Sequence, residues 1–153
     1  MKTAIRVMII IAMVIISSSF AAQAGDIKLS RNLLLPDDVK IIPPSSTLPP
    51  QLAMLSGVWE GDWEGNLDAA LVVENITENG GSIVYSWGDY WPWNITKGYH
   101  RSEIKIDGDT IIFISPSKKV TSTVKALNKN TIIILREAPT YTKETKLKRV
   151  KVQ

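Results

Sequence analysis

Few side chains in this chain of 153 residues could take part in acid–base or nucleophilic chemistry. His100 is the only histidine and cysteine is absent, which excludes metal sites built from imidazole and thiolate ligands. A serine triad would depend on His100 alone. This histidine lies beside Arg101 in a strand-like run, and no nucleophile elbow is present. We therefore expect a histidine that is hydrogen-bonded or faces solvent, and no metal site.

Carboxylates are the remaining catalytic candidates. Glycoside hydrolysis needs two of them ~5–9 Å apart, and four acids could supply such a pair: Glu60, Asp62, Asp68 and Glu74. Acids that alternate along a strand usually form its solvated face. A small hydrolase that uses Glu60 and Asp62 stays a third alternative, but the sequence favours a protein that is not an enzyme and has no cofactor.

Aromatic residues are better candidates for a binding site. Eight of the nine tryptophan and tyrosine residues lie between Trp59 and Tyr99. We predict that the ligand-binding residues are Trp63, Tyr85, Trp87, Tyr90, Trp91 and Trp93. The first three point inward and the last three form a loop at the mouth. These rings either line an apolar cavity or fill the interior completely, and the sequence leaves both alternatives open.

Eight strand-like runs separated by mostly short turns position these rings. The runs cover residues 57–64, 67–76, 82–87, 99–106, 110–115, 120–126, 131–136 and 141–150. Asn79-Gly80-Gly81 and Asp107-Gly108-Asp109 are typical hairpin turns. This pattern predicts an all-β fold, an eight-stranded antiparallel up-and-down barrel that leaves no exposed sheet edge.

The distribution of charge favours closure of the barrel. Residues 57–109 hold ten acids and three bases, whereas residues 110–153 hold two acids and ten bases. In a closed barrel the first and last strands are neighbours. Outward Glu60, Asp62 and Glu64 would then meet outward Lys146 and Lys148 across the seam. Two unrelated solvated faces are the alternative explanation.

The N-terminus has the pattern of an export signal. Lys2 and Arg6 flank the start of an apolar run over residues 7–16, and Ala22-Gln23-Ala24 is a typical cleavage site. The run is shorter than the ~20 residues needed to span a bilayer. We interpret residues 1–24 as a cleaved signal peptide, so the protein is expected to be exported, periplasmic or secreted, without a membrane span in its mature form.

Residues 25–56 form a proline-rich extended arm that precedes the barrel domain at residues 57–153. The arm holds five of the eight prolines and is predicted to end in one helical turn over residues 50–55. Its apolar clusters, at residues 33–35 and 41–42, would be more stable if buried. Residues 111–114 and 132–135 are apolar on both faces. Either the arm or a second subunit in a homodimer is expected to cover their outward side.

A tryptophan and an arginine at the two ends of the predicted barrel carry a family resemblance. Trp59 lies in a Gly-x-Trp step on the first strand, and Arg149 lies on the last. This arrangement resembles the calycin superfamily, and in particular compact lipocalin-like domains of exported bacterial proteins. The resemblance implies that Trp59 closes one end of the barrel and that Arg149 packs across its indole.

The expected function is non-catalytic binding of a small apolar or amphipathic molecule inside the barrel. The alternative is an interaction module with a solid barrel, which binds a protein or carbohydrate partner through its aromatic loop or outer face. Nucleic acid is not an expected partner, because the mature chain has sixteen bases and fifteen acids and a net charge of only +1.

Overall fold

The computed structural model describes residues 27–151, so the predicted signal peptide at residues 1–24 lies outside the described residues. An extended arm leads to a short helix, α1, at Pro50–Ala53. Eight strands follow, with a 3-10 turn, η1, at Trp91–Trp93 between the third and the fourth. The strands are β1 (Gly57–Trp63), β2 (Leu67–Thr77), β3 (Gly80–Trp87), β4 (Gly98–Asp107), β5 (Thr110–Ile114), β6 (Thr121–Asn128), β7 (Thr131–Ala138) and β8 (Tyr141–Val150).

The strands form a closed antiparallel barrel in which each pairs with its neighbours in sequence and β1 pairs with β8. This confirms the predicted fold class. The seam is short, because the β1–β8 register contains only Val58↔Val150, Trp59↔Arg149 and Glu60↔Lys148. The β1–β2 register, in contrast, runs along all seven residues of β1. Side chains must therefore contribute to closure where the backbone ladder ends.

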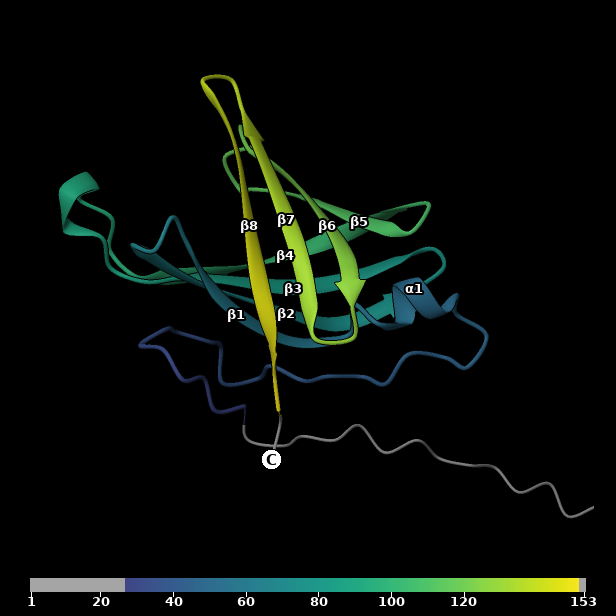
Figure 1. The fold of residues 1–153 in the computed structure, drawn as a ribbon. Helices are drawn as coiled ribbons and strands as arrows, with labels where there is room; N and C mark the ends of the chain where they lie inside the picture. Colours follow the sequence, from purple (N-terminus) through teal and green to yellow (C-terminus); the bar gives the residue numbers. More distant parts are fainter. Residues whose placement is uncertain (1–26, 152–153) are drawn as a thin grey trace, which may run out of the picture.

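The two ends of the barrel differ. Leu48, Leu52 and Leu55, on and around α1, are buried in the main apolar core together with inward residues of the strands. Figure 1 shows α1 at one end of the barrel and the β3–β4 loop, with η1, projecting at the other. One end of the interior is thus filled, and the other is bordered by loops.

The arm packs on the outside of the barrel, but not where the sequence suggested. A second apolar cluster joins its residues Ile27, Leu29, Leu35, Val39 and Ile41 to outward Val58, Val72, Val84 and Val150. Figure 1 shows the arm running along β1 and β2. It therefore covers β1–β3, and the apolar outer faces of β5 and β7 are not part of this cluster. The arm buries its apolar side chains there against a row of outward valines, which the sequence pattern did not single out.

Candidate functional site

A cup opens at the loop end of the barrel. Its volume is about 760 Å³. Side chains of β1, β2, β3, β4, β7 and β8 form its wall, and the β1–β2, β3–β4 and β5–β6 loops form its rim. The interior is thus solid at the α1 end and hollow at the loop end. The sequence left open whether the interior is filled or contains an apolar cavity, and the structure has a filled end and an open end.

Five of the six predicted aromatic residues line the cup: Trp63, Tyr85, Trp87, Tyr90 and Trp93. Tyr85 is only 2% exposed and stacks on Trp87, with their ring centroids 6.3 Å apart. Trp63 donates a hydrogen bond from Nε1 to the Tyr85 hydroxyl over 2.7 Å. Three of these rings are consequently fixed in the wall.

The mouth loop divides the other predicted rings. Tyr90 and Trp93 meet edge to face, with centroids 5.2 Å apart, and both line the cup. Trp91 is 80% exposed and is not part of the lining. Asn94 adopts a left-handed conformation, with φ of 51°, at the end of η1. The tight turn therefore directs Trp93 toward the cup and Trp91 toward solvent.

Arg136 is a wall residue that the sequence reasoning missed. Its guanidinium carbon lies 5.5 Å from the Trp63 ring centroid and 5.2 Å from that of Tyr85. Nη1 donates a hydrogen bond to the Tyr85 hydroxyl over 3.3 Å, but Nε is buried without a partner. No ion pair between described residues includes Arg136. The guanidinium of Arg136 therefore packs on the rings of Trp63 and Tyr85 and is not paired with a carboxylate of the described residues.

His100 lies in the same wall and corrects a prediction. It is neither hydrogen-bonded at Nε2 nor open to solvent there, because this atom is buried without a partner among the described residues. An unsatisfied buried nitrogen costs ~1–3 kcal/mol. The rings of Tyr85, Trp87 and Phe113 surround the imidazole at centroid distances of 5.7, 5.8 and 6.2 Å. Burial, and then the charge of Arg136, lower the pKa of His100.

The α1 end is closed by Trp59 and Arg149. The guanidinium carbon of Arg149 lies 4.0 Å from the centroid of the fully buried Trp59 ring. Its nitrogens donate hydrogen bonds to three backbone carbonyls, those of Met54, Ser56 and Lys129. Trp59 itself donates from Nε1 to the carbonyl of Leu55 over 2.9 Å. These contacts join the short seam to the segment around α1.

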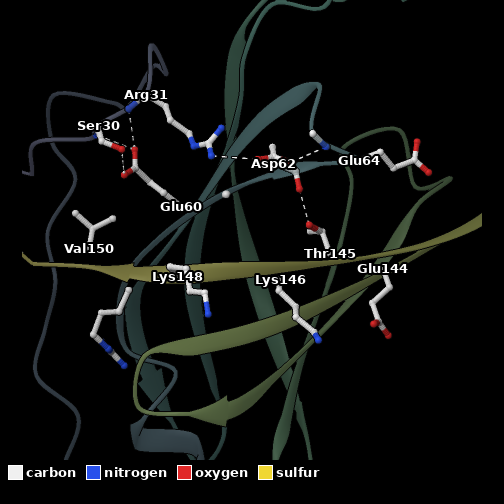
Figure 2. A pocket seen from close by; sticks show the side chains of 13 residues that line it. Ser30, Arg31, Glu60, Asp62, Glu64, Glu144, Thr145, Lys146, Lys148 and Val150 are labelled. Atoms are coloured by element: carbon white, nitrogen blue, oxygen red, sulfur yellow. Dashed lines mark hydrogen bonds and ion pairs between the residues drawn. The ribbon is translucent and has the colours of Figure 1, made fainter.

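A second hollow, of about 750 Å³, lies on the outer surface across the β1–β8 seam (Figure 2). The buried Glu60 carboxylate accepts hydrogen bonds from the backbone amides of Ser30 and Arg31 and from the Ser30 hydroxyl. The Arg31 guanidinium binds Asp62 and Asp68. The arm thus satisfies two of the acids that line this hollow, Glu60 and Asp62.

These contacts correct the predicted charge pairing across the seam. Figure 2 shows the side chains of Lys146 and Lys148 extending away from the carboxylates of Glu60 and Asp62, and Lys148 donates to the Thr131 hydroxyl instead. An ion pair does cross the seam, between Lys143 and Glu64. The arm competes successfully for the other acids because its backbone amides and Arg31 reach them from outside.

The four candidate catalytic carboxylates lie outside the cup. Besides the three acids already described, Glu74 is engaged by Arg101 through two hydrogen bonds of 2.9 Å. None of the four lines the cup. Among residues 27–151, no group of three His, Cys, Asp or Glu side chains is arranged to hold a metal ion. No helix in this range has the length and apolar character needed to cross a membrane.

Comparisons of the chain with protein-family models, curated proteins and solved structures gave no match.

Proposed function

We propose that the mature chain is an exported, non-catalytic binding protein that holds one small apolar or amphipathic molecule in the cup. The observation that carries this proposal is the contrast between the two halves of the barrel interior. One half is filled by leucines and branched residues, whereas the other leaves about 760 Å³ lined by aromatic rings. Concave, mostly apolar pockets with a few polar groups are typical ligand sites.

The calycin-like character of the chain belongs to the same proposal. The packing of Arg149 on Trp59 is the contact that the resemblance implied, and it supports a lipocalin-like reading of the barrel. Export through the N-terminal signal is likewise proposed, and it would place the protein in the periplasm or the surrounding medium.

Two tryptophans of the mouth loop provide a matched test. Binding of N-phenyl-1-naphthylamine, a neutral dye that fluoresces in apolar sites, is measured with Trp93→Ala and Trp91→Ala. Trp93 lines the cup and Trp91 does not, so only Trp93→Ala should weaken the dye, by about three- to tenfold for one lost aromatic contact. Equal affinities in both variants and the unchanged protein would contradict binding in the cup.

The aromatic loop favours one second candidate, an interaction module for a protein or carbohydrate partner. Trp91 is 80% exposed and Trp93 63% exposed, and sugar rings stack on such indoles. This alternative predicts that Trp91→Ala abolishes retention on a carbohydrate array while dye binding persists. An array on which neither the unchanged protein nor the variants are retained would argue against a carbohydrate partner.

The outer face of β5 and β7 leaves a homodimer as a further proposal about partners. Ile114 is 44% exposed, and outward Ile112 and Ile133 are partly exposed. Sedimentation velocity should show a dimer that Ile133→Lys converts to a monomer. A monomer at all accessible concentrations of the unchanged protein would exclude this assembly.

A further inference from the structure

Two unpartnered nitrogens mark one region of the cup wall. In the described part of the chain, Arg136 Nε and His100 Nε2 are the buried side-chain polar atoms that have no hydrogen-bond partner. Arg136 comes from β7 and His100 from β4, and both residues line the cup. Tyr85 lies between them, with its ring centroid 5.2 Å from the guanidinium carbon and 5.7 Å from the imidazole centroid. The two nitrogens therefore belong to one site.

The charge in this region is unbalanced. At the rim, Glu64 and Lys143 neutralise one another in an ion pair. Deeper in the wall the Tyr85 hydroxyl only accepts hydrogen bonds, from Trp63 and Arg136. The described residues that line the cup thus supply no anion to Arg136, although buried charges are normally paired.

The serine hydroxyls at the rim do not neutralise the positive charge of Arg136. The side chains of Ser115 and Ser117 hydrogen-bond to one another over 3.0 Å, and Ser115 also accepts from the backbone amide of Val120. They satisfy each other and leave Arg136 as the positive charge of an apolar wall. Such a wall is complementary to an amphipathic molecule with a negative end.

We propose that the molecule bound in the cup carries an anionic group seated against Arg136 and His100, and that its binding draws a proton onto His100. This inference rests on the proposed binding function. Arg136 is half-buried rather than enclosed, so part of its guanidinium is accessible from the cup. A guanidinium that donates to a carboxylate, sulfonate or phosphate forms the stronger, charge-assisted type of hydrogen bond.

The proton follows from the surroundings of His100. In the free protein, burial and the charge of Arg136 lower the pKa of the imidazole. A bound anion offsets the charge of Arg136 and accepts a hydrogen bond from the protonated ring, which raises the pKa in the complex. Affinity for the anion must therefore increase as pH falls through the pKa of the complex, and level off below the pKa of the free protein.

Other titratable groups face this region and need controls. Tyr85 approaches from β3, and burial raises the pKa of its hydroxyl, so it stays protonated near neutral pH. Tyr90 lies in the mouth loop, and Tyr141, Lys143 and Glu64 lie at the rim. Glu64→Gln removes the only carboxylate of the lining from the titration. His100→Gln removes the imidazole.

Two dyes that share one ring system test the proposal. 1-Anilinonaphthalene-8-sulfonate carries a sulfonate that is ionised throughout the pH range, and N-phenyl-1-naphthylamine lacks it. We expect Arg136→Met to weaken binding of the sulfonate dye roughly tenfold or more, as for one lost charge-assisted contact. Binding of the neutral dye should weaken much less, because this dye has no charge to pair with Arg136. Lys125→Met, which removes a remote charge paired with Asp109, should affect neither dye. Competition between the dyes shows that they share the cup.

The pH profile tests the proton. The affinity of the unchanged protein and of Glu64→Gln for the sulfonate should rise as pH is lowered from about 8 to about 6, across the usual histidine range. It should stay flat in His100→Gln. Calorimetry in buffers of different ionisation enthalpy should show proton uptake. A flat profile in the unchanged protein would overturn the role of His100.

The outcomes separate this inference from the function beneath it. If neither dye binds, the proposed function fails and the inference fails with it. If the neutral dye binds to the unchanged protein and the sulfonate dye does not, the cup binds apolar molecules but the anion site is overturned. This comparison needs no variant, so it holds even if Arg136→Met does not fold.

Discussion

Replacing Arg149 by methionine should destabilise the barrel far more than replacing an outward lysine of β8. Methionine keeps most of the aliphatic stem and removes the guanidinium. That group lies 4.0 Å from the Trp59 ring centroid and donates to the carbonyls of Met54, Ser56 and Lys129. It thus connects the three-pair seam to the segment that closes the barrel.

The expected loss can be worked out from these contacts. A desolvated cation–π contact contributes ~1–2 kcal/mol. The partly buried carbonyls of Met54 and Ser56 lose a charged donor, which costs ~1.5 kcal/mol each at the lower end of the usual range. The carbonyl of Lys129 is exposed and regains water. Because neighbouring contacts are not additive, we expect a total of about 3 kcal/mol, a large part of the ~5–15 kcal/mol of a typical domain.

Urea unfolding followed by circular dichroism and tryptophan fluorescence measures this loss. At a slope of ~1.5 kcal/mol per molar urea, the midpoint should fall by roughly 2 M. Lys146→Met is the matched control, because this exposed lysine lies on the same strand and points away from the interior, and its effect should stay within about 0.5 kcal/mol. A loss below about 1 kcal/mol in Arg149→Met would refute the closing role of the arginine.

Three further predictions test the seam, the arm and the histidine. Gly61→Val should cost ~1–3 kcal/mol in urea unfolding, because an added Cβ would lie 2.9 Å from the backbone oxygen of Lys146; unchanged stability would show that the seam can widen. Deleting residues 25–41 should lower the urea midpoint and increase binding of an apolar dye, since it uncovers the outer valines of β1–β3; no change in either would contradict the docked arm. Burial and the charge of Arg136 lower the pKa of His100 in the folded protein. Between this lowered pKa and the ordinary histidine pKa of about 6.5, the unfolded chain therefore binds more protons than the folded protein. The free energy of unfolding should consequently decrease as pH falls from about 6.5 through the pKa of the folded protein. His100→Gln should lack this step in unfolding titrations, and an identical pH profile in both proteins would contradict it.

The barrel could be predicted from the sequence because its signals are local. Hairpin turns such as Asp107-Gly108-Asp109 and alternating apolar residues lie within a few positions of the strands they define, and the predicted strand ends differ from the observed ones by no more than two residues. The route of the arm could not be predicted. It depends on contacts such as those of Arg31 with Asp62 and Asp68, which join residues 31 and 37 positions apart in the sequence without any periodic pattern.

The aromatic residues of the candidate site could be selected from the sequence. The polar wall residues Arg136 and His100 were missed, although the strand pattern indicated their position. Ile132, Ile134 and Arg136 share the inward face of β7 by the period of two. The same period places His100 on the inward face of β4, which it shares with Ser102. A cation that continues an inward apolar row indicates a polar wall group. The pattern cannot show that no carboxylate of the described residues pairs with Arg136, because this depends on the other five strands that line the cup.

Native mass spectrometry of the protein, exported by a bacterial host and purified without detergent, tests the binding function most directly. We expect an ion heavier than the mature chain by a few hundred daltons, a mass that a cup of about 760 Å³ can hold, or a corresponding increase after addition of N-phenyl-1-naphthylamine. A bare mass in both spectra would contradict it.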